Sequence, residues 1–259
     1  MLVYRRRGRG YRPSRDDSVS RGRSPVSRSA DSAAASCYPP GRLVVVISGR
    51  GSNFVAIADA IEAGQLPATI ELVVADRSSA AGLAEARRRQ LPTAIVDYTS
   101  YEQRELFDQA LAERIASANP DWVVLAGFMR ILGCAVVERF AGRMLNIHPS
   151  LLPAYPGLNT HQRVIDDGGE KHGATVHLVT GELDGGPILG RVEVAVSPQD
   201  NALRLADRVL NQEHRLYPWV LKLLLEGRMV WTPGAGLALD GVPVPDGVLL
   251  GVEREAECQ

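Results

Sequence analysis

From Leu43 onward, short apolar runs alternate with helical patterns along the chain, and this order limits the folds that it can adopt. Short β-branched runs predict buried strands, and apolar residues three and four apart predict helices. The strand-like runs are LVVVIS (43–48), IELVVAD (70–76), TAIVD (93–97) and DWVVLAG (121–127), and the helical segments are FVAIADAIEAG (54–64), AAGLAEARRRQ (80–90) and 101–118. This order predicts an α/β, Rossmann-like fold: a mostly parallel central sheet flanked by helices, with right-handed crossovers.

The later elements follow a less regular pattern. On the helix over 101–118, Leu106, Phe107, Leu111 and Ile115 are expected to share one face. After Gly127 the expected elements are a helix over 134–140, a strand at RMLNI (143–147), a helix over 161–167 and strands at ATVHLV (174–179) and RVEVAV (191–196). A long amphipathic helix over 201–227 closes the domain, and Pro218 is expected to kink or interrupt it. A loop with a short hairpin is expected after Trp231.

The chain divides into three predicted parts: a disordered extension over 1–41, one domain over 42–245 and a C-terminal tail over 246–259. The extension is rich in Arg, Ser and Gly and has few side chains to bury, which predicts disorder. Three interpretations of it stay open. It is a basic tail for nucleic acid, an organelle transit peptide, or upstream sequence read only in the gene model, and the last two together are favoured over the first.

Composition narrows the class of protein. A hydrophobic share of 45% suits a sizeable core, and a net charge of -1 from 29 basic and 30 acidic residues gives no global attraction to nucleic acid or an anionic membrane. Cys37, Cys134 and Cys258 lack the spacing of a zinc site or a disulfide scaffold. No run is long and apolar enough to span a bilayer. We therefore expect a cytoplasmic protein that binds no metal, no nucleic acid and no membrane.

The first candidate site is SGRGSNF, Ser48 to Phe54, between a predicted strand and a predicted helix. A Gly-rich turn at this place directs backbone N–H groups, and the helix dipole, toward an anion. The motif is neither a Walker A loop nor a dinucleotide fingerprint, so a single phosphate is the expected ligand. The alternative is a tight turn in which Ser52 or Asn53 caps the helix.

The second candidate is NIHPSLLPAYPG, Asn146 to Gly157, whose prolines predict a stiff loop rather than a helix or a central strand. Asn146 and His148 are two residues apart, so on an extended chain their side chains share a face. Together they could stabilise a developing oxyanion, the Asn through its amide and the His as an acid. A lone His in a loop is more often structural, although a rigid loop favours a preorganised role.

The third candidate is GELDGGP, Gly181 to Pro187, where Asp184 is either a turn acid or a carboxylate placed in a crevice. Beside His148 it would favour the protonated imidazole. Strand ends of an open α/β sheet converge on one crevice, which makes the contact plausible. Pattern alone predicts that His177 is a core or supporting residue and that Glu213, His214 and Arg104 lie on solvated helix faces.

Five longer stretches resemble the phosphoribosylglycinamide formyltransferases, a branch of the formyltetrahydrofolate-dependent formyltransferases. They are VVVISGRGSNF, PDWVVLAGFMRIL, MLNIHPSLLPAYPGL, HGATVHLVTGELDGGP and QEHRLYP. The resemblance covers about Leu43 to Gly227. It implies direct formyl transfer from the co-substrate 10-formyltetrahydrofolate to the amine of glycinamide ribonucleotide, without a metal or a covalent enzyme intermediate, and it leaves a homodimer open.

The resemblance also implies a role for each matched residue. Gly51, Ser52 and Asn53 would hold the ribonucleotide phosphate, and Glu213 would reach its ribose or glycinamide end. Asn146 and His148 would stabilise the tetrahedral intermediate, and Asp184 would position and charge His148 and help to relay protons. The folate would be bound by Arg104, Met129, Arg130, Ile131, Leu132, Asn146 and the loop formed by Thr180, Gly181, Glu182, Leu183 and Asp184.

Two departures and three rival functions accompany the resemblance. The chain has Gly190 and Arg191 where the family leads us to expect a nearby Gln, and 1–41 has no family counterpart. A formyltetrahydrofolate deformylase normally has an additional N-terminal regulatory domain, and methionyl-tRNA formyltransferase needs a C-terminal domain. A catalytically silent nucleotide-binding module is disfavoured because Asn146, His148 and Asp184 are all present.

Overall fold

The structure is a computed structural model, and it describes residues 39–251. The main sheet has eight strands in the order β11-β7-β6-β5-β4-β1-β2-β3. Its strands are β1 (Gly41–Ile47), β2 (Ala68–Ala75), β3 (Thr93–Ile95), β4 (Trp122–Leu125), β5 (Met144–His148), β6 (Lys171–Leu178), β7 (Ile188–Ala195) and β11 (Val248–Leu249). Only the β5–β6 and β6–β7 pairings are antiparallel, so the predicted mostly parallel sheet is confirmed.

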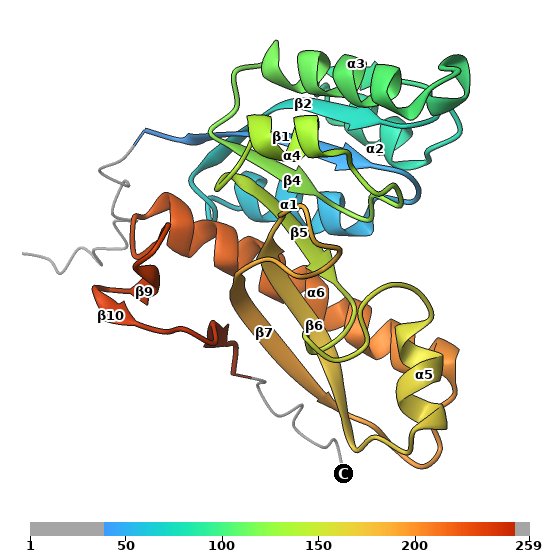
Figure 1. Ribbon diagram of the computed structural model, residues 1–259, viewed down its shortest axis with the longest axis vertical. Helices are drawn as coiled ribbons and strands as arrows, with labels where there is room; N and C mark the ends of the chain where they lie inside the picture. Colours follow the sequence, from blue (N-terminus) through green and yellow to red (C-terminus); the bar gives the residue numbers. More distant parts are fainter. Residues whose placement is uncertain (1–38, 252–259) are drawn as a thin grey trace, which may run out of the picture. The chain divides into compact units, whose positions relative to one another are not determined.

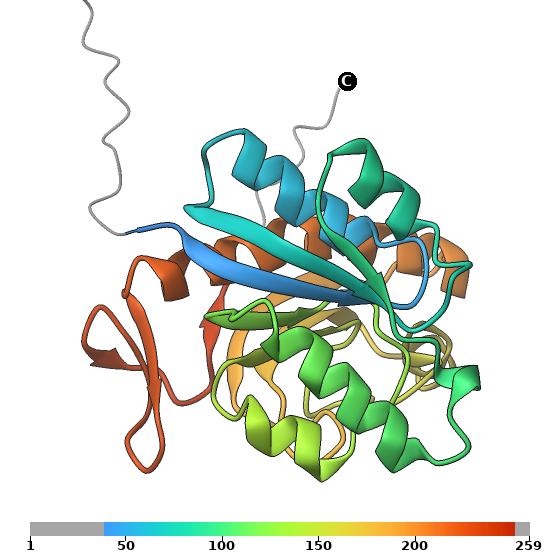
Figure 2. The ribbon, with the colours of Figure 1, turned by 90° about the horizontal axis from the view of Figure 1, so that it is seen from above.

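Helices cover both faces of this sheet (Figures 1 and 2). The helices are α1 (Ser52–Glu62), α2 (Gly82–Arg88), α3 (Arg104–Ala116), α4 (Cys134–Arg139), α5 (Thr160–Asp166) and α6 (Ala202–Leu225), with a 3-10 turn η1 (Tyr98–Ser100). Side chains alternate along β1: Leu43, Val45 and Ile47 belong to the core that α1 and α6 cover, whereas Val44 and Val46 belong to the core beneath α3 and α4. This two-sided burial explains why β1 reads as a continuous apolar run.

The Tyr217 side chain on α6 joins two central strands. It is fully buried, and its hydroxyl lies 3.1 Å from the carbonyl oxygens of both Leu125 and Leu145. Burial raises the pKa of this phenol well above 10, so it stays a hydrogen-bond donor. The contact fixes α6 against β4 and β5, the two strands that carry much of the candidate site.

One expectation in the helices was wrong and a second was wrong in part. Phe107, Leu111 and Ile115 are buried, but Leu106 is 49% exposed because the buried stripe of α3 follows i, i+4 and i+8, and Leu106 lies one row beside it. Pro218, expected to kink or interrupt the last helix, does not interrupt it, since α6 runs from Ala202 to Leu225 with this proline inside it. Buried neighbours on both sides of Pro218 pack the helix against the sheet and compensate for the missing N–H.

The C-terminal segment is more ordered than expected. A second sheet, with strand order β10-β9-β8, is built from β8 (Met229–Thr232), β9 (Gly236–Leu239) and β10 (Val242–Pro243). Val248 and Leu249, assigned to a tail, instead form β11 and pair with β7 in the main sheet. Domain limits at 41 and 245 stay a prediction. The expected disorder of the extension falls on residues that lie, up to residue 38, outside the described range, as do residues 252–259.

Candidate functional site

A cavity of about 760 Å³ opens where strands β1, β4 and β5 end. All but one of the predicted site residues line it, although they come from distant parts of the sequence. The lining includes Gly51, Ser52, Asn53, Met129, Arg130, Ile131, Leu132, Asn146, His148, Thr180, Gly181, Glu182, Leu183, Asp184 and Glu213. Arg104 is absent from the lining, and so is Arg191. This is the volume and position at which open α/β sheets bind small molecules.

The loop after β1 leaves the start of α1 open toward this cavity. Gly51 is the N-cap residue in a left-handed conformation (φ 73°), and a Cβ there would lie 3.2 Å from the Cα of Gly82. No side chain caps α1, so the alternative in which Ser52 or Asn53 is the helix cap was wrong. With no acidic residue in the first turn, its backbone N–H groups and the helix dipole favour an anion.

Asn53 and Glu213 connect α1 to α6 beside this anion site. The Asn53 amide Nδ2 donates a hydrogen bond of 2.6 Å to Glu213 Oε2, and both residues are less than 10% exposed. The expectation that Glu213 lies on a solvated helix face was therefore wrong. Burial raises the pKa of the Glu213 carboxyl, and the hydrogen bond from Asn53 opposes this rise. A buried carboxylate is costly in the folded protein, which favours a role for Glu213 in recognition over one in stability.

Asn146 and His148 both lie on β5. The strand expected over 143–147 is therefore confirmed for Asn146, whereas His148, expected in the proline loop, instead ends this central strand. The loop begins only at Pro149, where the strand can no longer continue. Asn146 Nδ2 lies 3.2 Å from His177 Nε2, and His177 Nδ1 lies 3.0 Å from the Leu178 carbonyl oxygen. The carbonyl requires the proton on Nδ1, so Nε2 accepts from Asn146. Burial lowers the pKa of His177, which keeps this acceptor neutral.

The His148 and Asp184 side chains lie next to each other in the wall of the cavity. His148 Nε2 lies 2.9 Å from the Tyr155 carbonyl oxygen and therefore donates to it, whereas Nδ1 lies 3.5 Å from Asp184 Oδ2. Asp184 Oδ2 also accepts a 2.8 Å hydrogen bond from the Gly157 backbone N–H. The contact fixes the orientation of the imidazole and leaves Nδ1 as the nitrogen next to the carboxylate.

The Asp-Gly-Gly loop can approach so closely because Gly186 has no side chain. A Cβ at Gly186 would lie 1.8 Å from the Leu178 carbonyl oxygen, which no other residue could tolerate without moving the loop. Asp184 itself has a positive φ of 52°. The glycine therefore allows the loop to fold back against the end of β6 and to bring Asp184 to His148.

Three exposed apolar side chains also line the cavity, and a hydrogen bond from Arg104 holds the backbone beside one of them. Met129, Ile131 and Leu183 are each more than half exposed, and they line the cavity mouth. Arg104, whose part in folate binding stays a prediction, does not line the cavity but donates a 2.6 Å hydrogen bond to the Ile131 carbonyl oxygen. The side chains are thus arranged to take a large, partly apolar ligand between them.

Asp76 is a supporting residue that sequence reasoning missed. It is fully buried at the end of β2, and its carboxylate lies 2.8 Å from Arg130 Nε and 3.1 Å from Arg77 Nε. The Arg130 guanidinium also lies over the Tyr98 ring, 3.1 Å from its centroid. The available signal was an acid directly after the buried run IELVVA, at the strand edge where the site forms.

No cluster of three or more His, Cys, Asp or Glu residues suited to a metal ion occurs between residues 39 and 251. Over the same range, no helix has the length and hydropathy needed to cross a membrane.

Known proteins with this sequence pattern share the site-bearing part of the chain. The family model described as formyl transferase matches residues 41–221. The phosphoribosylglycinamide formyltransferase of Escherichia coli K12 is 44% identical over 203 residues, which cover 78% of this chain and 95% of that protein. The corresponding enzyme of Haemophilus influenzae is 42% identical over 188 residues, 73% of this chain and 89% of that protein.

Solved structures agree with the sequence relatives. The phosphoribosylglycinamide formyltransferase of Coxiella burnetii superposes with a TM-score of 0.78 at 41% identity and covers 82% of this chain and 100% of its own. A formyltetrahydrofolate deformylase of Pseudomonas syringae is only 24% identical and shows the shared fold alone. The range matched by the family model includes the loop with Gly51, Ser52 and Asn53 as well as Asn146, His148, Asp184 and Glu213. The chain therefore belongs to the formyl transferase family.

Proposed function

We propose that this protein is a phosphoribosylglycinamide formyltransferase, which moves the formyl group of 10-formyltetrahydrofolate to the amine of glycinamide ribonucleotide in purine biosynthesis. The observation that carries the proposal is one cavity that joins an open helix N-terminus at 51–53 to Asn146, His148 and Asp184. The named activity of the relatives supports it.

The two ends of the cavity suit two different ligands. Gly51, Ser52 and Asn53 would bind the ribonucleotide phosphate, because backbone N–H groups at a helix start bind anions. Glu213 lies within the same cavity and would accept hydrogen bonds from the ribose or the glycinamide amine. The folate would occupy the wall formed by Met129, Ile131 and Leu132 and the loop 180–184. The exposed apolar side chains of Met129, Ile131 and Leu183 suit an aromatic ring system.

The residues between these ends match the needs of the reaction. As the amine attacks the formyl carbon, one C–N bond forms, negative charge builds on the formyl oxygen, and the C–N bond to the folate then breaks. Asn146 has a second amide N–H beyond the one donated to His177, and it would donate to this oxygen. His148 would donate through Nδ1, with Asp184 stabilising its positive charge. The amine proton passes to the leaving nitrogen of the folate, directly or through water.

An assay with and without the ribonucleotide tests the proposal. Tetrahydrofolate release, followed by absorbance, is expected only when 10-formyltetrahydrofolate and glycinamide ribonucleotide are both present. Release that does not depend on the ribonucleotide would identify a deformylase instead. Binding of both compounds without any release would identify a silent module.

Asn53→Ala is expected to raise KM for glycinamide ribonucleotide by about tenfold or more, while kcat changes only a few-fold. The variant removes the amide that holds the Glu213 carboxylate at 2.6 Å beside the anion site. Steady-state kinetics with varied ribonucleotide measure the effect, and Asn211→Ala at an exposed position of α6 is the control. An unchanged KM in Asn53→Ala would contradict the assignment of this end of the cavity.

Glu213→Gln is expected to stabilise the fold in a pH-dependent way while it weakens ribonucleotide binding. Because burial raises the pKa of Glu213 above its usual 4.5, the folded protein binds this proton more tightly than the unfolded chain does. The wild type therefore loses stability as pH rises from 4.5 through the raised pKa, whereas glutamine has no proton to lose.

Thermal unfolding at pH 4.5 and pH 8 measures this effect. The melting temperatures of Glu213→Gln and wild type are expected to agree at pH 4.5, and the variant is expected to melt a few degrees higher at pH 8. Glu102→Gln, at an exposed position, is the control and should follow the wild type at both pH values. A constant difference across pH would show that burial of the Glu213 charge is not the cause.

The proposal extends to the setting of the enzyme. We expect it to act in the cytoplasm on two small molecules, without a metal and without nucleic acid. A monomer or a homodimer would serve the chemistry equally, because both ligand subsites lie within one chain, and sedimentation would distinguish the two.

A further inference from the structure

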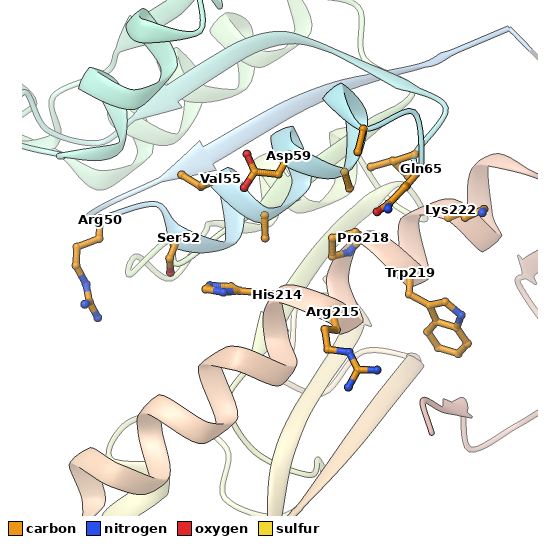
Figure 3. Close-up of a pocket in the computed structure, with 14 residues that line it drawn as sticks. Arg50, Ser52, Val55, Asp59, Gln65, His214, Arg215, Pro218, Trp219 and Lys222 are labelled. Atoms are coloured by element: carbon orange, nitrogen blue, oxygen red, sulfur yellow. The ribbon is translucent and has the colours of Figure 1, made fainter. Parts of the chain in front are cut away.

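A second concave surface borders this site and shares Arg50 and Ser52 with it: a groove of about 890 Å³ between α1 and α6. Figure 3 shows α1 along one side and the end of α6, with Pro218 and Trp219, along the other. Ala56, Ala60 and Ala63 also line the groove, and their spacing of four and three places them on one helix face. Small side chains on one wall and a proline and an indole on the other make an apolar slot in the size range of small-molecule sites.

The rim of the groove carries an excess of positive charge. Arg50, Arg215 and Lys222 line it, and the only acidic residue in the lining is Asp59. Asp59 is already paired at 2.5 Å with Arg89, which lies outside the groove. Arg50 forms no ion pair with any residue in the described range, and the Lys222 amine is 3.8 Å from Glu226. The rim therefore complements an anion.

The groove also offers unused hydrogen-bonding groups at His214. Its Nε2 is shielded from solvent and has no partner within residues 39–251. Pro218 has no N–H, so the helix hydrogen bond that would satisfy the His214 carbonyl is missing. Polar groups left without partners in this way favour a ligand that can hydrogen-bond to them.

We propose that this groove binds a planar aromatic molecule that carries a phosphate, of the nucleoside monophosphate class. The ring lies between the alanine face of α1 and the side chains of Pro218 and Trp219. The ring edge hydrogen-bonds to His214, and the phosphate is held by the basic rim. This site is distinct from the cavity that contains His148 and Asp184, neither of which lines the groove.

The groove lies back to back with the anion site. Arg50 and Ser52 line both, and Glu213 and His214 are neighbours on α6 that line the cavity and the groove respectively. If the proposed function holds, any change that a ligand in the groove makes in the affinity for the ribonucleotide would be matched by an equal change in the reverse direction.

Equilibrium dialysis of the apo protein with adenosine monophosphate tests the site without any need for formyl transfer. Ala56→Leu fills the slot and is expected to weaken binding by about tenfold or more. Lys222→Glu reverses a rim charge and is expected to weaken it by about fivefold. The control variant Ala84→Leu has the same alanine-to-leucine change as Ala56→Leu, but at an exposed position of α2. It should bind adenosine monophosphate like the wild type. Adenosine and inorganic phosphate alone are expected to bind at least about tenfold more weakly than the nucleotide.

Several results would overturn the proposal. No binding of adenosine monophosphate by the wild type at millimolar concentration would do so. Equal affinity in all four proteins would place the nucleotide elsewhere, for example in the cavity at 51–53. If inorganic phosphate bound as tightly as adenosine monophosphate, the aromatic ring would add no affinity and the groove would not be a nucleotide site. If the wild type bound no nucleotide but self-associated with rising concentration, and Ala56→Leu abolished this association, the groove would be a contact with a second copy of the chain.

Discussion

Alanine at Asn146 or at His148 is expected to lower kcat by roughly 100- to 1,000-fold and to leave KM for the ribonucleotide within a few-fold of wild type. Both side chains come from β5, and they hold their positions through His177 and through the Tyr155 carbonyl. In the proposed mechanism they are therefore in place before negative charge develops on the formyl oxygen, and their loss would raise the barrier without changing the proposed phosphate site at 51–53. Single-turnover kinetics separate the chemical step from binding.

The controls for these two variants are structural and chemical. Asn211→Ala on the exposed face of α6 should keep full activity. Circular dichroism and ribonucleotide binding should show that both site variants remain folded and still bind. Wild-type turnover in His148→Ala would refute the role given to this imidazole, and a raised KM with normal kcat would make Asn146 a binding residue only.

Asp184→Asn is expected to lower kcat by about 100-fold or more, although the side chain keeps its size. The amide oxygen can still accept from the Gly157 N–H, so the loop is expected to keep its conformation. What is lost is the negative charge that lies 3.5 Å from His148 Nδ1, and with it the electrostatic contact on which the proposed role of the imidazole depends. The measurement is kcat with both substrates saturating, together with the melting temperature.

Asp246→Asn at an exposed position provides the matched control and should be as active as wild type. If Asp184→Asn and Asp246→Asn had equal turnover, the carboxylate would have only a structural role in the loop. If Asp184→Asn lost activity and melting temperature together, the loop conformation rather than the charge would explain the loss.

Local periodicity was enough to predict the main sheet apart from its short edge strand β11, and the helices that cover it, because strands and helices are repeated patterns within a few residues. Predictions from local periodicity failed where contacts between residues distant in the sequence determine burial or helix continuity. Glu213 has polar neighbours in the sequence and so looked solvated, yet it is buried against Asn53, which is 160 positions away. Pro218 looked like a break, but the buried residues around it keep α6 continuous. Tertiary contacts outweigh local preference at both positions.

The site was only partly predictable for the same reason. Motifs identified Asn146, His148 and Asp184, but no spacing rule brings residues 148 and 184 together. Their contact depends on Gly186, which lets the loop pass within van der Waals distance of Leu178, and on the Gly157 N–H. Asp76 had no motif at all, and its importance emerged only from its ion pairs with Arg77 and Arg130.

The hydrogen bond from His148 Nε2 to the Tyr155 carbonyl limits what the imidazole can do in the proposed reaction. It uses the Nε2 proton, so Nδ1, which lies beside Asp184, is the ring nitrogen left for the substrates. If Nδ1 donates to the formyl oxygen, as proposed, it cannot also accept the proton of the attacking amine. That proton must then reach the leaving nitrogen of the folate directly or through water, and not by way of His148.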